Sequence, residues 1–141
     1  MPADIIIPTP VATQYENVAL TNPTITGGTA SGMTVAGPIN AQTGTTYVLA
    51  ATDVFSACAL VTLSNANPIT VTVPKNSAVP IAVGSTINLQ QIGAGQVTFA
   101  PVDGDVTINP SATLKISAQW KGATLIKTAT NVWSLIGSLS A

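Results

Sequence analysis

Few residues in this sequence have types and spacings that could support chemistry. Asp103-Gly104-Asp105 places two carboxylates two positions apart, a spacing that could contribute to a Ca²⁺ loop. Ca²⁺ takes about six to eight oxygen ligands, however, and no further acid lies nearby in the sequence. A hairpin turn explains Asp-Gly with fewer assumptions. We therefore predict a turn and leave open whether these carboxylates bind any ion.

The other candidate chemical groups also lack the partners that they would need. Cys58 is the only cysteine and has apolar neighbours, which is typical of a small buried hydrophobic side chain. The sequence contains no His, which excludes a His-activated thiolate, a His-dependent hydrolase and a His-ligated metal site. Residues 93–95 lack the Lys and the following helix of a phosphate loop, and predict a hairpin turn between strands at 86–91 and 96–100. We therefore expect no catalytic residue, no cofactor, no metal and no enzyme activity.

Aromatic side chains could stack on sugar rings, as in an adhesin. The candidates for such stacking are Tyr15, Tyr47, Trp120 and Trp133. Both tryptophans lie in register with branched residues of predicted strands, which favours burial in a core or an interface over sugar binding. The lysines at 115, 121 and 127 are predicted to be solvated strand positions that prevent strand edges from pairing wrongly.

Charge is scarce throughout the chain. Of 141 residues 46% are hydrophobic but only 6% are charged, against about 25% in an ordinary soluble domain. Four scattered Lys and no Arg cannot supply the basic stripe of a nucleic-acid binder. No apolar run approaches the length of about 20 residues that a spanning helix needs, so we expect no membrane partner.

The polar surface is instead supplied by hydroxyl and amide side chains. Such a surface can be buried against another subunit without the penalty of desolvating ions. The composition therefore favours a subunit of an assembly. A β-protein with a merely neutral surface is the alternative.

Residues 1–17 are predicted to form an extended N-terminal arm. Three prolines in the first ten residues are incompatible with a helix interior or a central strand. Ordering one residue costs about 1–2 kcal/mol of backbone entropy, whereas burying one Ile returns about 1.5–3 kcal/mol, so the arm needs a partner to become ordered. Alternatively, residues 5–7 form a strand of the main sheet. The predicted contact residues are Ile5, Ile6, Ile7, Val11 and Tyr15.

Residues 18–43 have a different texture and are predicted to form a short β-wound neck. Short alternations of apolar residues with Thr are separated by Gly-Gly, Ser-Gly and Gly-Pro turn signals. Segments this short cannot make a core alone, but three wound chains could pool their apolar side chains. A flexible linker is the alternative. The predicted trimer-interface residues are Leu20, Ile25, Met33, Val35 and Ile39.

Residues 44–141 are predicted to form an all-β knob. The alternation of branched residues with Thr at 69–73 is typical of a half-buried strand, and about eight such segments follow one another. Their spacing predicts an antiparallel β-sandwich or barrel. A short helix is expected only within 51–59. The predicted strands are 46–49, 60–63, 69–73, 86–91, 97–99, 106–108, 114–120, 123–128 and 132–136.

Three segments in this order resemble a module of structural proteins of tailed bacteriophages: TVTVP at 70–74, IGAGQVTF at 92–99 and WSLIG at 133–137. The resemblance covers about residues 44–139. The preceding NPTITGG at 22–28 is similar to the β-wound shafts of phage fibres and head ornaments. Such modules usually form homotrimers. The resemblance implies a protein of the virion, without any catalytic signature to carry over.

The arrangement of arm, neck and knob favours one position on the virion. It leaves no room for a separate tail-docking domain, which favours a trimeric capsid decoration protein or a short head fibre. Such a protein would be made in the host cytoplasm and would dock on the major capsid protein through its arm, on the outer surface of the head. The alternative is a receptor-binding tip of a tail fibre or spike that recognises host glycan.

Overall fold

The structure, a computed structural model, describes residues 37–141, and this part of the chain is all-β. The predicted arm and most of the predicted neck lie outside the described residues. Among the described residues, no helix is long and apolar enough to cross a membrane. The predicted contact residues outside the described range are Ile5, Ile6, Ile7, Val11, Tyr15, Leu20, Ile25, Met33 and Val35.

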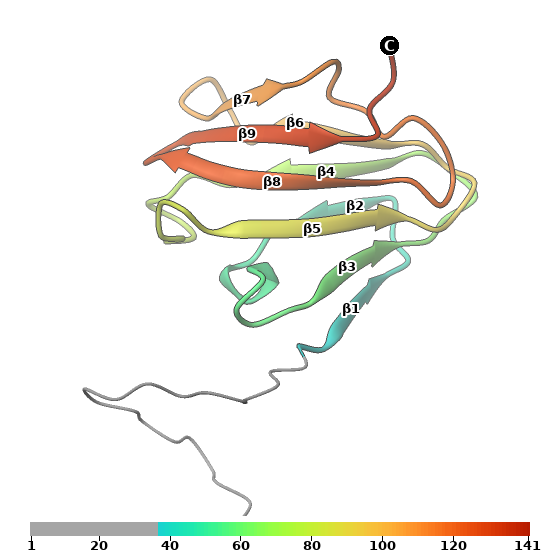
Figure 1. The fold of residues 1–141 in the computed structure, drawn as a ribbon, viewed down its shortest axis with the longest axis horizontal. Coiled ribbons are helices and arrows are strands. Elements are labelled where there is room, and N and C mark those ends of the chain that lie inside the picture. The colour runs from blue at the N-terminus through green and yellow to red at the C-terminus, as the bar shows by residue number, and fades with distance from the viewer. Residues whose placement is uncertain (1–36) are drawn as a thin grey trace, which may run out of the picture. The chain divides into compact units, whose positions relative to one another are not determined.

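The strands form two sheets (Figure 1). Sheet A has the order β1-β3-β5-β8-β9-β7, and sheet B has the order β2-β4-β6. Sheet A contains β1 (Ile39–Gln42), β3 (Leu60–Leu63), β5 (Thr86–Gln91), β8 (Gly122–Ala129), β9 (Val132–Gly137) and β7 (Thr107–Pro110). Sheet B contains β2 (Thr46–Val48), β4 (Ile69–Val73) and β6 (Val97–Pro101).

The chain winds in coils that resemble a β-solenoid, because its first six strands alternate between the two sheets. β1, β3 and β5 pair in parallel in sheet A, and β2, β4 and β6 pair in parallel in sheet B. Parallel neighbours need a long crossover, and here the intervening strand in the opposite sheet provides it. The all-β class is confirmed, but the prediction of an antiparallel sandwich or barrel is wrong. Antiparallel pairing between named strands occurs only where β8 meets β5 and β9.

The Gly93–Gly95 segment is a corner between coils, so the predicted hairpin is wrong. The strands that it connects, β5 and β6, lie in different sheets. Its backbone stacks on the preceding corner, where the Gly95 N–H donates to the Asn65 carbonyl at 2.8 Å. A Cβ on Gly95 would lie 1.8 Å from the Asn67 carbonyl oxygen, so only glycine permits this approach.

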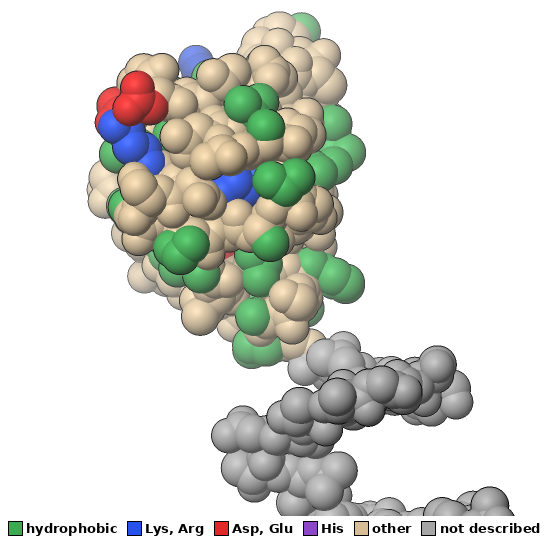
Figure 2. All heavy atoms as spheres, turned by 90° about the vertical axis from the view of Figure 1, so that its left-hand side faces the viewer, with side chains coloured by type: hydrophobic (Ala, Val, Ile, Leu, Met, Phe, Trp, Pro, Cys, Tyr) green, Lys and Arg blue, Asp and Glu red, His purple; other side chains and the backbone are tan. Residues whose placement is uncertain are grey.

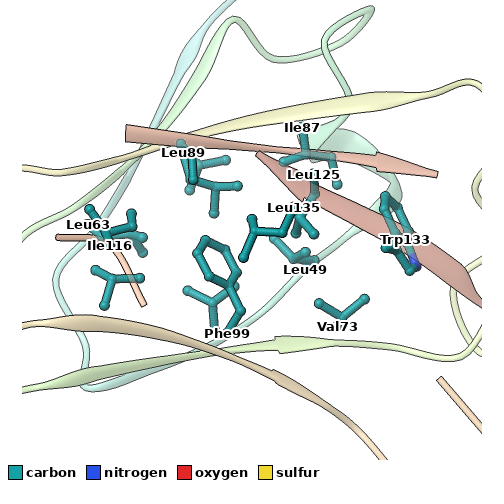
Figure 3. Packing of buried hydrophobic residues seen from close by; sticks show 14 of the residues in the cluster. Leu49, Leu63, Val73, Ile87, Leu89, Phe99, Ile116, Leu125, Trp133 and Leu135 are labelled. Carbon is teal, nitrogen blue, oxygen red and sulfur yellow. The ribbon is translucent and has the colours of Figure 1, made fainter. Parts of the chain in front are cut away.

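The hydrophobic core lies between the two sheets. Figure 3 shows Val73 and Phe99 of sheet B pointing toward Ile87, Leu125 and Leu135 of sheet A. Each of these side chains is at most 1% exposed. Burying one such side chain contributes about 1.5–3 kcal/mol, so this layer stabilises the coil stack.

Two local predictions are confirmed and one is wrong. Cys58 is buried, and the expected short helix is a single 3₁₀ turn, η1 (Ala51–Asp53). The predicted strand at 114–120 does not form. Only Lys115 and Ile116 make isolated bridges there, and Trp120 has a positive φ of 66° that ends any extended run.

Candidate interaction surfaces

The outward side of sheet A, which we call face A, carries no charged side chain at its strand positions. The inward positions of β3, β5 and β8 are buried and the alternate ones are more exposed. The only Lys of these strands, Lys127, is at an inward position. Face A consists of Ile39, Ala41, Leu60, Thr62, Thr86, Asn88, Gln90, Thr107, Asn109, Gly122, Thr124, Ile126, Thr128, Val132, Ser134 and Ile136.

A row of face A runs from the open edge strand across five strands. Ile39 pairs with Leu60, Asn88 pairs with Thr124, and Thr124 pairs with Ile136. Ile39 and Ile136 at its two ends are 58% and 46% exposed. Apolar groups therefore flank a polar centre in which Thr124 donates to Asn88 Oδ1 at 2.9 Å.

A shallow hollow of about 370 Å³ lies on this row. Its lining includes Leu60, Asn88, Thr124 and Ile136, together with Gly122 of β8 and Gly137 of β9. Gly137 has a φ of 136°, and a Cβ there would lie 2.6 Å from the Gly122 carbonyl oxygen. Two neighbouring strands therefore approach closely without side chains, which leaves the hollow open.

The exposed ion pairs of the described part lie at one corner, in loops outside the strand positions that make up face A. Lys75 Nζ is 2.8 Å from the Asp103 carboxylate and 2.6 Å from that of Asp105. Figure 2 shows red and blue side chains gathered at this corner of a largely uncharged surface. The hydrogen bond from Lys75 lowers the pKa of Asp103, and the same bond raises the pKa of Lys75.

The predicted turn at Asp103-Gly104-Asp105 is confirmed, although it connects strands of different sheets and is not a hairpin. The Asp105 N–H donates to Asp103 Oδ1 at 3.0 Å. Within residues 37–141, no group of three or more His, Cys, Asp or Glu is placed to hold a metal ion.

A buried carboxylate fixes the first coil, and sequence reasoning missed it. Asp53 is 1% exposed and accepts hydrogen bonds from Asn40 Nδ2 at 2.8 Å, from the Ala50 N–H at 2.8 Å and from the Tyr47 hydroxyl at 2.8 and 2.9 Å. Burial, followed by the hydrogen bond to Asp53, raises the pKa of Tyr47. The cluster joins β1, β2 and η1 in the first coil. Its residues are too far apart in the sequence to be recognised as a motif.

The prediction that Lys127 is solvated is wrong, burial of Trp133 is confirmed, and Trp120 lies outside the core of the described residues, while its burial in an interface stays a prediction. Lys127 is only 2% exposed, because β8 turns it inward where it lies over the Trp133 ring. Trp120 is 65% exposed, since the positive φ turns its side chain out of the expected register. Its backbone N–H donates to the Gln91 carbonyl at 2.6 Å, which holds this conformation in place.

Of the predicted trimer-interface residues, only Ile39 lies among the described residues. It belongs to β1, which is hydrogen-bonded to β3, so the predicted neck enters sheet A at this strand. Comparisons with protein-family models, with curated proteins and with solved structures found no match to this chain.

Proposed function

We propose that this chain is a non-catalytic structural subunit of a bacteriophage virion, a trimeric capsid decoration protein or short head fibre. Residues 1–17 dock on the major capsid protein at the outer surface of the head. Residues 18–43 join the trimer. The coil stack is the rigid body that each arm anchors, and three arms on one trimer supply avidity.

The observation that carries the proposal is face A, an uncharged surface with exposed apolar side chains. Its exposed apolar side chains include Ile39, where the predicted neck enters the sheet, and Ile136 on the fifth of the six strands. Packing this surface against a second copy of the chain desolvates no ion. We therefore assign face A to the contact between copies in the trimer.

The size of face A supports a shared interface with the neck. Six strands about 4.8 Å apart and about five residues long cover about 500 Å². A stable interface buries about 800 Å² per partner. Face A therefore supplies part of the required area, and contacts of the preceding residues supply the rest.

Cryo-electron microscopy of the particle that carries this chain tests the proposal. We expect threefold clusters of this protein repeated over the head, with the N-terminal residues toward the shell. Density confined to the tail end would contradict the proposal and support the adhesin. N-termini that face solvent would contradict docking by the arm.

A second candidate function, glycan recognition by a tail-fibre or spike tip, rests on Trp120. This indole is exposed at a backbone geometry that non-glycine residues rarely adopt, and such geometry concentrates at functional positions. A glycan array probed with the full chain and with Trp120→Ala tests it. Phe55→Ala, which removes another exposed aromatic ring, is the matched control. Binding that only Trp120→Ala abolishes supports the adhesin, and absence of binding contradicts it.

A further inference from the structure

The amine of Lys127 is enclosed, and no carboxylate of residues 37–141 is paired with it. The residue is 2% exposed, and the ion pairs within the described range involve Lys75 instead. Its Nζ lies 5.4 Å from the centre of the Trp133 ring and contacts Asn76 Oδ1. A buried cation is normally paired, so an amine held against an amide calls for another explanation.

Hydrogen bonds of their backbones fix the positions of Lys127 and Asn76. The Lys127 N–H donates to the Ser85 carbonyl at 2.9 Å, and the Lys127 carbonyl accepts from the Gly84 N–H at 2.8 Å. The Asn76 N–H donates to Asn131 Oδ1 at 2.9 Å. Nζ of Lys127 thus contacts the carboxamide that contains the target carbon Cγ, and holding two reactants together raises their effective concentration.

We propose that Lys127 and Asn76 form an intramolecular amide cross-link that ties the loop after β4 to β8. The neutral amine of Lys127 attacks Cγ of Asn76, and a bond forms between Nζ and Cγ. The bond from Cγ to Nδ2 then breaks. The amide nitrogen leaves as ammonia and takes a proton from Nζ, so no oxidant, reductant or co-reactant is needed.

The surroundings of the pair favour both halves of this step. The Ile81 N–H donates to Asn76 Oδ1 at 3.2 Å, so it can stabilise the negative charge that develops on this oxygen during attack. Burial lowers the pKa of Lys127, which enlarges the share of neutral amine. No carboxylate of the described residues hydrogen-bonds to either side chain. The proton therefore passes within the intermediate, and the cross-link accumulates slowly after folding.

Mass spectrometry of the folded full chain, taken fresh and after days of incubation, tests the proposal. We expect the aged protein to be lighter by one ammonia and to yield a branched peptide that joins residues 76 and 127. Lys127→Met keeps a long apolar stem and should retain the full mass. Lys121→Met, at an exposed lysine, should mature like the unmodified sequence.

The design separates the cross-link from cyclisation of Asn76 onto the Ser77 backbone, which loses the same ammonia. Cyclisation would persist in Lys127→Met and would give no branched peptide. That result, or full mass in an aged protein that circular dichroism shows to be folded, would overturn the proposal. Circular dichroism of Lys127→Met shows whether its mass is read on a folded chain.

Discussion

Asp53 is a buried carboxylate whose hydrogen-bond partners are all neutral donors. Asn40, Tyr47 and the Ala50 N–H together give both of its oxygens hydrogen-bond donors, so its burial is tolerated without a cation. These partners come from β1, β2 and the start of η1. At the scale of single residues, this network holds the first coil, formed by β1, β2 and η1, in place.

Replacing this carboxylate should therefore destabilise the fold. In Asp53→Asn, the new amide group faces either the Asn40 or the Ala50 donor, whichever way it is turned. We expect a loss of about 1–3 kcal/mol in the free energy of unfolding, measured by urea denaturation. Asp105→Asn alters an exposed carboxylate and should leave the unfolding midpoint nearly unchanged. Equal midpoints for the two variants would contradict a structural role for Asp53.

The exposed ion pair offers a prediction about pH. Because Lys75 lowers the pKa of Asp103 in the folded state, the pair stabilises the fold above the unfolded pKa of Asp103. This stability is lost as pH falls through the folded pKa. The same pair raises the pKa of Lys75, so at high pH its stabilisation is present below the unfolded pKa of Lys75 and is lost as pH rises through the folded pKa of Lys75. Solvent screening keeps the contribution of this exposed pair small.

NMR titration of the Asp103 carboxyl carbon checks the direction of this shift. The midpoint should lie below the ordinary value of 3.8 in the unmodified protein. Lys75→Met should raise it toward that value, while the comparable change at exposed Lys115 should leave it in place. An unchanged midpoint in Lys75→Met would show that Lys75 does not perturb Asp103.

At the scale of elements, the stacked corners decide how one coil follows another. Asn65 Nδ2 donates to the Thr43 carbonyl at 2.6 Å, and the Asn65 carbonyl accepts from Gly95 at 2.8 Å. Successive corners are thus joined by short hydrogen bonds. Each corner turns the chain into the opposite sheet instead of back along the same sheet.

A methyl group at the Gly93–Gly95 corner, between β5 and β6, should disrupt this stacking. Gly95→Ala would place Cβ against the Asn67 carbonyl, and backbone cannot move aside as a flexible side chain can. We expect a marked fall in thermal midpoint or a loss of soluble protein. Gly104→Ala, whose Cβ would meet nothing within 4 Å, is the matched control. Tolerance of Ala at position 95 would mean that the corners are not closely stacked.

The strand positions could be predicted from sequence far better than their pairing. Alternation at 69–73 gives the bounds of β4 and the side that it buries, because side chains alternate in any strand. The same alternation fits parallel and antiparallel neighbours equally, so Gly93–Gly95 suited a hairpin as well as a corner. Lys127 and Trp120 were misplaced because a buried amine and a positive φ depend on tertiary contacts.

At the scale of the whole molecule, the distribution of charge separates two kinds of surface. The described carboxylates and amines lie buried or outside face A, while face A presents hydroxyl, amide and apolar groups. In the proposed trimer, these uncharged faces meet at the interface and the Lys75 corner remains in solvent. Ile39 belongs to both the predicted neck and face A, so we propose that the predicted interface extends across the sheet.

A charge introduced on face A should therefore weaken the trimer without unfolding the chain. Ile136→Lys would bury an unpaired ammonium at the interface, at a penalty of several kcal/mol. We expect light scattering coupled to gel filtration to show that this variant dissociates at protein concentrations at which the unmodified chain is still a trimer, with unchanged circular dichroism. Val83→Lys, at a position that is 60% exposed and lies before β5, should leave the trimer intact. If both variants dissociate alike, or the unmodified chain is a monomer, face A is not the contact between copies.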